Sequence, residues 1–119
     1  MNMSLMNIKN ITVLGSGVMG HGIAQVSAMA GYNVALRDID QKFLDKAMGK
    51  IIWSLNKLVE KNKITKQESE KIIGRIKTYV DLRESLNDSD LVIEAVPEDM
   101  NLKKKIYAEL DKLAPSNTV

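Results

Sequence analysis

The sequence contains no cysteine and a single histidine, His21. The absence of cysteine excludes disulfide bonds and thiolate metal sites, and one histidine is too few for the usual histidine-cluster site, so we expect no bound metal. No stretch reaches the ~18 apolar residues of a membrane-spanning helix. The opening residues 1–7 lack both the apolar run of a signal peptide and the arginine-rich pattern of a transit peptide. These absences predict a cytoplasmic protein without a membrane partner.

Aromatic residues are also scarce, at 4% of the chain, and the net charge is only +2. Both values argue against nucleic acid as a partner. The hydrophobic fraction of 45% and the charged fraction of 27% are ordinary for a globular protein. A length of 119 residues allows one domain at most.

Hydrophobic periodicity divides the chain into alternating strands and helices. Short β-branched or apolar runs predict strands at 11–14, 32–36, 76–80 and 90–96, the third at a sheet edge and the last buried. Helical spacing predicts a buried helix at 18–30 and further helices at 41–62, 65–75 and 99–113, with a turn at 86–89. This alternation predicts an α/β fold with a parallel, doubly wound sheet. Residues 117–119 read as the start of another strand, so we expect a fragment whose sheet is incomplete at the C-terminal end.

A G-x-G-x-x-G motif stands between the first predicted strand and the first predicted helix. Gly15 permits a tight turn, Gly17 lets a pyrophosphate approach the backbone, and Gly20 lets helix and strand pack closely. The free N–H groups of the helix start then face the diphosphate. In this context the motif predicts a Rossmann-type dinucleotide site made by Gly15, Ser16, Gly17, Val18, Met19 and Gly20. The alternative is a glycine turn in an unrelated α/β fold.

Asp38 follows the second predicted strand and is placed to accept hydrogen bonds from the ribose hydroxyls of adenosine. A carboxylate there repels a 2′-phosphate, so the sequence favours NAD over NADP as the cofactor. Arg37 is adjacent, but strand alternation sends neighbouring side chains to opposite faces, and we discount it for that reason. In the alternative interpretation Asp38 is merely solvated.

The run GSGVMGHGIA at 15–24 resembles the 3-hydroxyacyl-CoA dehydrogenase family. The run LVIEAVPE at 91–98, followed by Lys103, is similar to the second NAD-binding segment of that family, and the similarity extends over 37–38 and 115–118. The resemblance implies an NAD-dependent oxidoreductase of fatty acid metabolism that interconverts 3-hydroxyacyl-CoA and 3-oxoacyl-CoA.

The resemblance also implies that Glu98 and Lys103 contact NAD nearer its nicotinamide end. Both residues follow the carboxyl end of a predicted strand, where open α/β sheets bind ligands. Simpler roles stay open, because Glu98 is also a favourable charge at the start of a helix and Lys103 is one of three consecutive lysines. We interpret Glu94, inside the strand, as a capped or paired structural carboxylate.

The predicted helix 41–62 carries a polar stripe at helical spacing, here named the lysine stripe: Lys42, Lys46, Lys50, Ser54, Lys57 and Lys61. Opposite charges are absent from these positions, so the stripe is suited to the phosphates of coenzyme A. The family resemblance implies CoA contacts at Ser54 and Lys61, with acyl-CoA as the substrate partner. The alternative is a solvated helix face.

No catalytic residue is expected within residues 1–119. We interpret His21, in the first turn of its helix, as a satisfied or partly exposed side chain. The resemblance implies that the catalytic histidine and its glutamate follow residue 119, together with a helical domain that supplies the acyl-chain pocket and the dimer contacts of a homo-oligomeric parent. The chain alone is therefore expected to be inactive. Two other functions stay open, another β-hydroxyacid or polyol dehydrogenase and a stand-alone NAD-sensing module.

Overall fold

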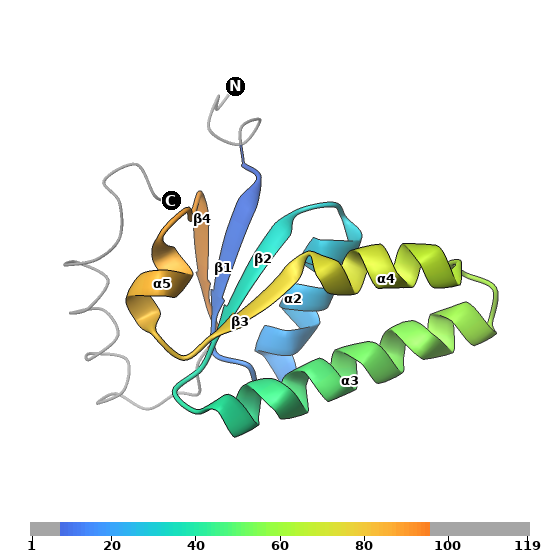
Figure 1. Ribbon diagram of the computed structural model, residues 1–119, viewed down its shortest axis with the longest axis horizontal. Helices are drawn as coiled ribbons and strands as arrows, with labels where there is room; N and C mark the ends of the chain where they lie inside the picture. Colours follow the sequence, from blue (N-terminus) through green and yellow to red (C-terminus); the bar gives the residue numbers. More distant parts are fainter. Residues whose placement is uncertain (1–7, 96–119) are drawn as a thin grey trace.

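The described strands form one parallel sheet. The computed structural model describes residues 8–95. Within them β1 (Asn10–Leu14), β2 (Asn33–Arg37), β3 (Ile76–Tyr79) and β4 (Leu91–Glu94) pair in the order β3-β2-β1-β4 (Figure 1). The chain runs outward from β1 to β3 and then returns to place β4 on the other side of β1. This confirms the predicted doubly wound topology, and the reversal puts the carboxyl ends of β1 and β4 where open α/β sheets bind ligands.

Helices cover both faces of this sheet. The helices α2 (Val18–Met29), α3 (Gln41–Glu60) and α4 (Lys66–Gly74) supply the residues that pack against one face. The short helix α5 (Leu82–Leu86) lies on the other face, where the Thr12 hydroxyl of β1 donates to the Ser85 carbonyl at 2.7 Å. As Figure 1 shows, α3 and α4 form a helical hairpin that extends sideways from the sheet.

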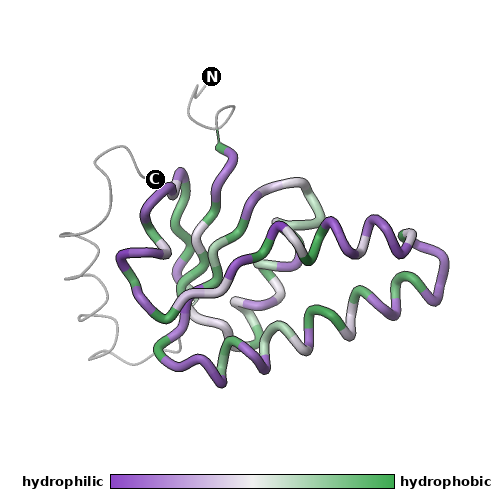
Figure 2. Tube along the Cα trace, in the orientation of Figure 1, coloured by the Kyte–Doolittle hydropathy of each residue, from purple (hydrophilic) through white to green (hydrophobic). Residues whose placement is uncertain are grey.

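The core lies between the sheet and the first three helices. Ile11, Val34 and Ile76 are register partners across three strands, and all three belong to the same buried cluster. They meet small and branched side chains of the helices, namely Ala24, Ala28, Leu44, Ala47, Ile51, Leu55 and Ile72. Figure 2 shows hydrophobic stretches within the sheet and an alternation of hydrophobic and hydrophilic residues along α3, as expected for a helix with one buried face.

Local caps decide where three of the four described helices begin. Asp40 accepts a hydrogen bond from the Lys42 backbone N–H at 2.9 Å and starts α3. Thr65 and Glu68 form the reciprocal capping box predicted for α4. Asp81 accepts from the Glu84 backbone N–H at 3.1 Å and starts α5. Among residues 8–95 no side chain caps α2, whose N-cap residue is Gly17.

Two predicted burials are wrong. The helix α2 is not buried all round, because only Gly20, Ala24 and Ala28 are buried while other apolar side chains of the helix are exposed. Strand β4 is half-buried along its whole length, because it forms an edge of the sheet within residues 8–95. Strand β3 lies at the other edge, as predicted.

The sequence interpretation also missed α5, which occupies a segment assigned to no element and ends at the first residue of the predicted turn. Five residues are too few for a periodicity to be visible, although Asp81 three positions before Glu84 is a recognisable capping pair. The helix predicted at 99–113 and the strand start at 117–119 lie outside the described residues. Within residues 8–95 no helix is long and apolar enough to cross a membrane.

Candidate functional site

The glycine loop joins the end of β1 to the start of α2 in a very tight turn. Gly15 has φ +102°, a left-handed conformation that favours glycine, and its N–H donates to the Arg37 carbonyl at 2.8 Å. A Cβ at Gly20 would lie only 1.8 Å from the Gly15 carbonyl oxygen. These contacts confirm the turn and the close packing expected for the first and third glycines, and they fix the N-terminus of α2 at the reversal point of the sheet.

The start of α2 is open toward an anion. A Cβ at Gly17 would meet no atom within 4 Å, the first turn contains no acidic residue, and no described side chain caps the helix. The first N–H groups of a helix have no partner within the helix, and the helix dipole favours negative charge at this end. Val18 and Met19 follow and are 80% and 67% exposed. The residues of the loop therefore fit the diphosphate of a dinucleotide.

Asp38 is bonded to the glycine loop. Its Oδ2 accepts hydrogen bonds from both the backbone N–H (2.9 Å) and the hydroxyl of Ser16, and its Oδ1 accepts from the Ile39 N–H at 2.7 Å. Ser16 is buried, so its hydroxyl points inward to Asp38. A carboxylate offers about four lone-pair positions, and these bonds leave one of them on Oδ1 for a ribose hydroxyl. Asp38 is thus not a merely solvated carboxylate.

Two neighbours of the loop are held by backbone carbonyls. The Arg37 Nε donates to the Val80 carbonyl at 3.0 Å, in the connection that follows β3. The His21 Nδ1 lies 2.6 Å from the Gly17 carbonyl oxygen, so this nitrogen carries the proton and donates. The half-buried His21 is therefore a satisfied side chain that fastens the first turn of α2.

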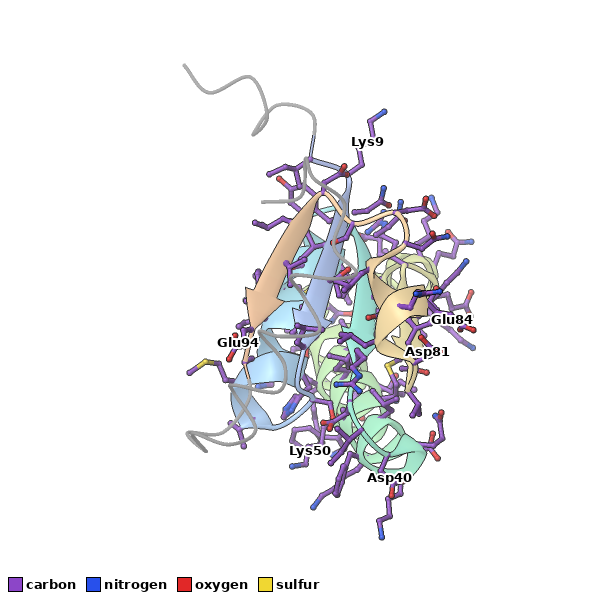
Figure 3. The ribbon with its side chains drawn as sticks, turned by 90° about the vertical axis from the view of Figure 1, so that its left-hand side faces the viewer. Lys9, Asp40, Lys50, Asp81, Glu84 and Glu94 are labelled. Carbon is purple, nitrogen blue, oxygen red and sulfur yellow. The ribbon has the colours of Figure 1, made fainter. Side chains whose placement is uncertain are left out.

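The lysine stripe lies along α3, and its charge is less uniformly positive than expected. Lys57 pairs with Glu60 at 3.5 Å, and its Nζ lies 5.5 Å from the centre of the Trp53 ring, so an acidic side chain does border the stripe. Lys61 is exposed at the C-terminal end of the helix. Figure 3 shows Lys50 and Asp40 at one end of the molecule and Lys9 at the opposite end, where β1 begins. The stripe thus extends from the end of the sheet that carries the glycine loop.

Ser54 contacts a residue that the sequence interpretation did not include. Gln25 of α2 donates from Nε2 to the Ser54 Oγ at 2.9 Å, across the interface of α2 and α3. No sequence signal reveals this contact, because the two residues belong to different helices. Ser54 is half-buried, whereas Lys61 is exposed.

A cavity and the carboxylate of Glu94 are two further features of the described residues. A cavity of about 250 Å³ lies on the α5 side of the sheet, lined among others by Asn33, Lys77 and Ser85 and by neither the glycine loop nor Asp38. Glu94 ends β4, as Figure 3 shows, and its side chain has no hydrogen-bond partner among residues 8–95, so the expected pairing is not observed there. Glu98 and Lys103 lie outside the described residues.

Comparison with known proteins identifies the family. Residues 10–119 match the family described as "3-hydroxyacyl-CoA dehydrogenase, NAD binding domain". A probable 3-hydroxyacyl-CoA dehydrogenase of Caenorhabditis elegans is 38% identical over 98% of this chain and 40% of its own length. A glyoxysomal fatty acid beta-oxidation multifunctional protein of Brassica napus is 37% identical over 94% of this chain and 15% of its own length.

The fold agrees with that assignment. The crystal structure of 3-hydroxybutyryl-CoA dehydrogenase from Escherichia coli K12 superposes with a TM-score of 0.89 at 37% identity, over 95% of this chain and 24% of that one. The chain thus spans between about one seventh and two fifths of the length of these relatives. It belongs to the 3-hydroxyacyl-CoA dehydrogenase family and carries the NAD-binding domain of that family.

Proposed function

We propose that this chain holds NAD for an oxidoreductase that interconverts 3-hydroxyacyl-CoA and 3-oxoacyl-CoA. The proposal rests on the contact between the glycine loop and Asp38. Ser16 donates two hydrogen bonds to the Asp38 carboxylate and so holds it beside the N-terminus of α2, which no described side chain caps. When bound, NAD would supply the acceptor for the hydride that leaves the substrate. The N–H groups that follow Gly17 bind its diphosphate, and the free lone pair of Asp38 receives a hydroxyl of the adenosine ribose.

The remaining parts of the cofactor site are extensions of the same proposal. Glu98 and Lys103 contact NAD nearer the nicotinamide, since both follow in sequence the carboxyl end of β4, the end at which open α/β sheets bind ligands. The acyl-CoA lies along the lysine stripe, with the Ser54 hydroxyl and the Lys61 ammonium on its phosphates. A cytoplasmic location and a homo-oligomeric parent stay predictions, and one relative is named as a glyoxysomal protein.

We further propose that the chain does not oxidise a substrate by itself. Hydride transfer needs a base on the 3-hydroxyl, and general base catalysis contributes about 10²–10⁴-fold. His21 is the single histidine of the sequence, and its Nδ1 is engaged with the Gly17 carbonyl. The role of the chain in this proposal is therefore to bind and orient the cofactor.

Isothermal calorimetry of the 119-residue chain with NAD and NADP tests the cofactor proposal. We expect tighter binding of NAD, because the Asp38 carboxylate repels a 2′-phosphate. In Asp38→Ala the affinity for NAD should fall and the difference between the two cofactors should narrow. Asp45→Ala, which removes an exposed carboxylate of α3, is the matched control and should retain the preference. Equal affinity of the unchanged chain for both cofactors would contradict the assignment of Asp38.

Titration with CoA tests the lysine stripe. We expect weak binding that falls in Ser54→Ala and in Lys61→Ala and that weakens as salt is added, since exposed charges are screened. Lys77→Ala, an exposed lysine of the edge strand β3, is the control and should bind CoA unchanged. If the Ser54 and Lys61 variants bind CoA like the starting chain, the stripe is a solvated helix face.

A further inference from the structure

Ser54 is a serine in the middle of a helix whose hydroxyl makes an unusual contact. A serine inside a helix commonly donates its O–H to a carbonyl three or four residues earlier. Ser85 in α5 does so, with its Oγ 2.7 Å from the Leu82 carbonyl. Ser54 makes no such bond among residues 8–95, and it takes part there only as the acceptor of the Gln25 amide. Its hydroxyl hydrogen therefore has no acceptor in this part of the chain.

The orientation of the Gln25 amide follows from its two contacts. The Nε2 atom lies 2.9 Å from the Ser54 Oγ and 3.9 Å from the Met29 sulfur. A thioether sulfur only accepts, so the contact with Met29 favours the orientation in which the amide nitrogen, the donor, lies on this side and reaches the Ser54 Oγ. Gln25 thus occupies one lone pair of Ser54 and turns the serine hydrogen away from α2.

We infer that Gln25 is a positioning residue that makes the Ser54 hydroxyl a dedicated donor to an anionic oxygen of the CoA bound on the lysine stripe. The inference depends on the proposed function, because it concerns the same CoA contact. Lys50 lies one helical turn before Ser54 and Lys61 lies two turns after it, so the acceptor that the stripe favours is a phosphate oxygen. A hydroxyl with its donor already directed outward binds that oxygen without first breaking an internal bond.

The substitution Gln25→Glu tests this inference because it keeps the shape of the side chain and reverses its hydrogen bonding. A glutamate accepts the Ser54 O–H, so the serine hydrogen is no longer available to a phosphate. Calorimetry with CoA should then show affinity lowered about tenfold or more, as for the loss of a hydrogen bond to a charged group. In Gln25→Met, which neither donates nor accepts strongly, we expect a smaller loss. A role in filling space alone predicts that Glu is tolerated at least as well as Met.

A double-mutant cycle separates the hydrogen bond from the added charge. On a Ser54→Ala background, Gln25→Glu should change the affinity for CoA less than twofold, because no hydroxyl remains to be reoriented. A loss that persists on that background comes from charge repulsion and contradicts the inference. The urea midpoint of each variant reports whether the fold is kept.

The remaining outcomes distinguish the inference from the proposal on which it depends. If Ser54→Ala weakens CoA binding and Gln25→Glu does not, Gln25 has no positioning role while the CoA site stands. If the unchanged chain binds no CoA, or Ser54→Ala binds it normally, the CoA contact and the inference both fail.

Discussion

Gly20 and Gly22 lie two positions apart in α2, and their surroundings are opposite. A Cβ at Gly20 would lie 1.8 Å from the Gly15 carbonyl oxygen and 3.6 Å from the Ala95 Cβ, whereas a Cβ at Gly22 would meet nothing within 4 Å. The first atom in the way belongs to the backbone of the glycine loop, which has no rotamer to adopt. Gly20 therefore sets the distance between α2 and β1.

This difference makes a matched pair of variants. We expect Gly20→Ala to destabilise the chain by about 1–3 kcal/mol, as overpacking does, and to abolish NAD binding because the loop must move. Gly22→Ala should stabilise it by up to about 1 kcal/mol, because alanine loses less entropy in a helix. Urea unfolding followed by circular dichroism measures both. Similar midpoints for the two variants would contradict the close contact at Gly20.

Asp38 illustrates how far single residues could be predicted. Its position at the end of a strand after a G-x-G-x-x-G motif was enough to expect a ribose contact. Its bond to the Ser16 hydroxyl was not visible in the pattern, because the spacing says nothing of which way a loop side chain turns. Gln25 was missed for a related reason. Its partner Ser54 is 29 positions away, and the rotation of α2 against α3 decides whether they meet.

At the scale of the elements, the carboxylate of Asp90 joins β1 to β4, the two strands between which the direction of the chain connections reverses. Asp90, just before β4, accepts hydrogen bonds from the backbone N–H groups of Lys9 (3.0 Å) and Asn10 (2.9 Å) at the start of β1. Its own N–H donates to the Asn10 carbonyl. The two backbone donors, Lys9 first, hold the pKa of the Asp90 carboxyl below its usual value.

This lowered pKa gives stability a pH dependence of known sign. A carboxyl with a lower pKa in the folded state stabilises that state above its unfolded pKa of about 3.9, and the contribution disappears as the pH falls through the folded value. We expect Asp90→Ala to cost about 1–2 kcal/mol at pH 7 and progressively less in acid. Urea midpoints of both proteins from pH 7 down to pH 2.5 measure this, and Asp88→Ala is the control. A difference that is constant over the range would contradict it.

The elements themselves were largely predictable, because periodicity and capping are local. The strands predicted at 11–14, 32–36 and 76–80 agree with β1, β2 and β3 to within one residue at each end, and the capping box at Thr65 is confirmed. Burial was read less well. Strand β4 has the apolar run of a central strand but forms an edge within residues 8–95, and the exposed side of α2 carries apolar residues such as Val26. An apolar run indicates that its residues prefer burial. Whether they are buried depends on which other elements pack against them, and the run itself does not show that.

At the scale of the whole molecule, we propose that the chain binds the cofactor and supplies no catalytic base. We expect no detectable oxidation of 3-hydroxybutyryl-CoA by the 119-residue chain at saturating NAD, followed by the absorbance of NADH. His21→Ala should give the same result, because the imidazole fastens the turn at Gly17 rather than facing a reacting atom. Turnover that disappears in His21→Ala would overturn both the structural interpretation of His21 and the proposed inactivity.

The bond from Asp90 to the start of β1 also bears on how the chain folds while it is being made. The residues it joins are 80 positions apart, and β1 is synthesised before the other three described strands. Strands β1 to β3 can pair as soon as β3 has left the ribosome. The side of β1 that pairs with β4 stays without a partner until β4 has been synthesised. At about 5–20 residues per second this delay is roughly one to three seconds. During it, the nascent chain exposes an unpaired parallel edge, which is a surface that chaperones or a second nascent chain would meet.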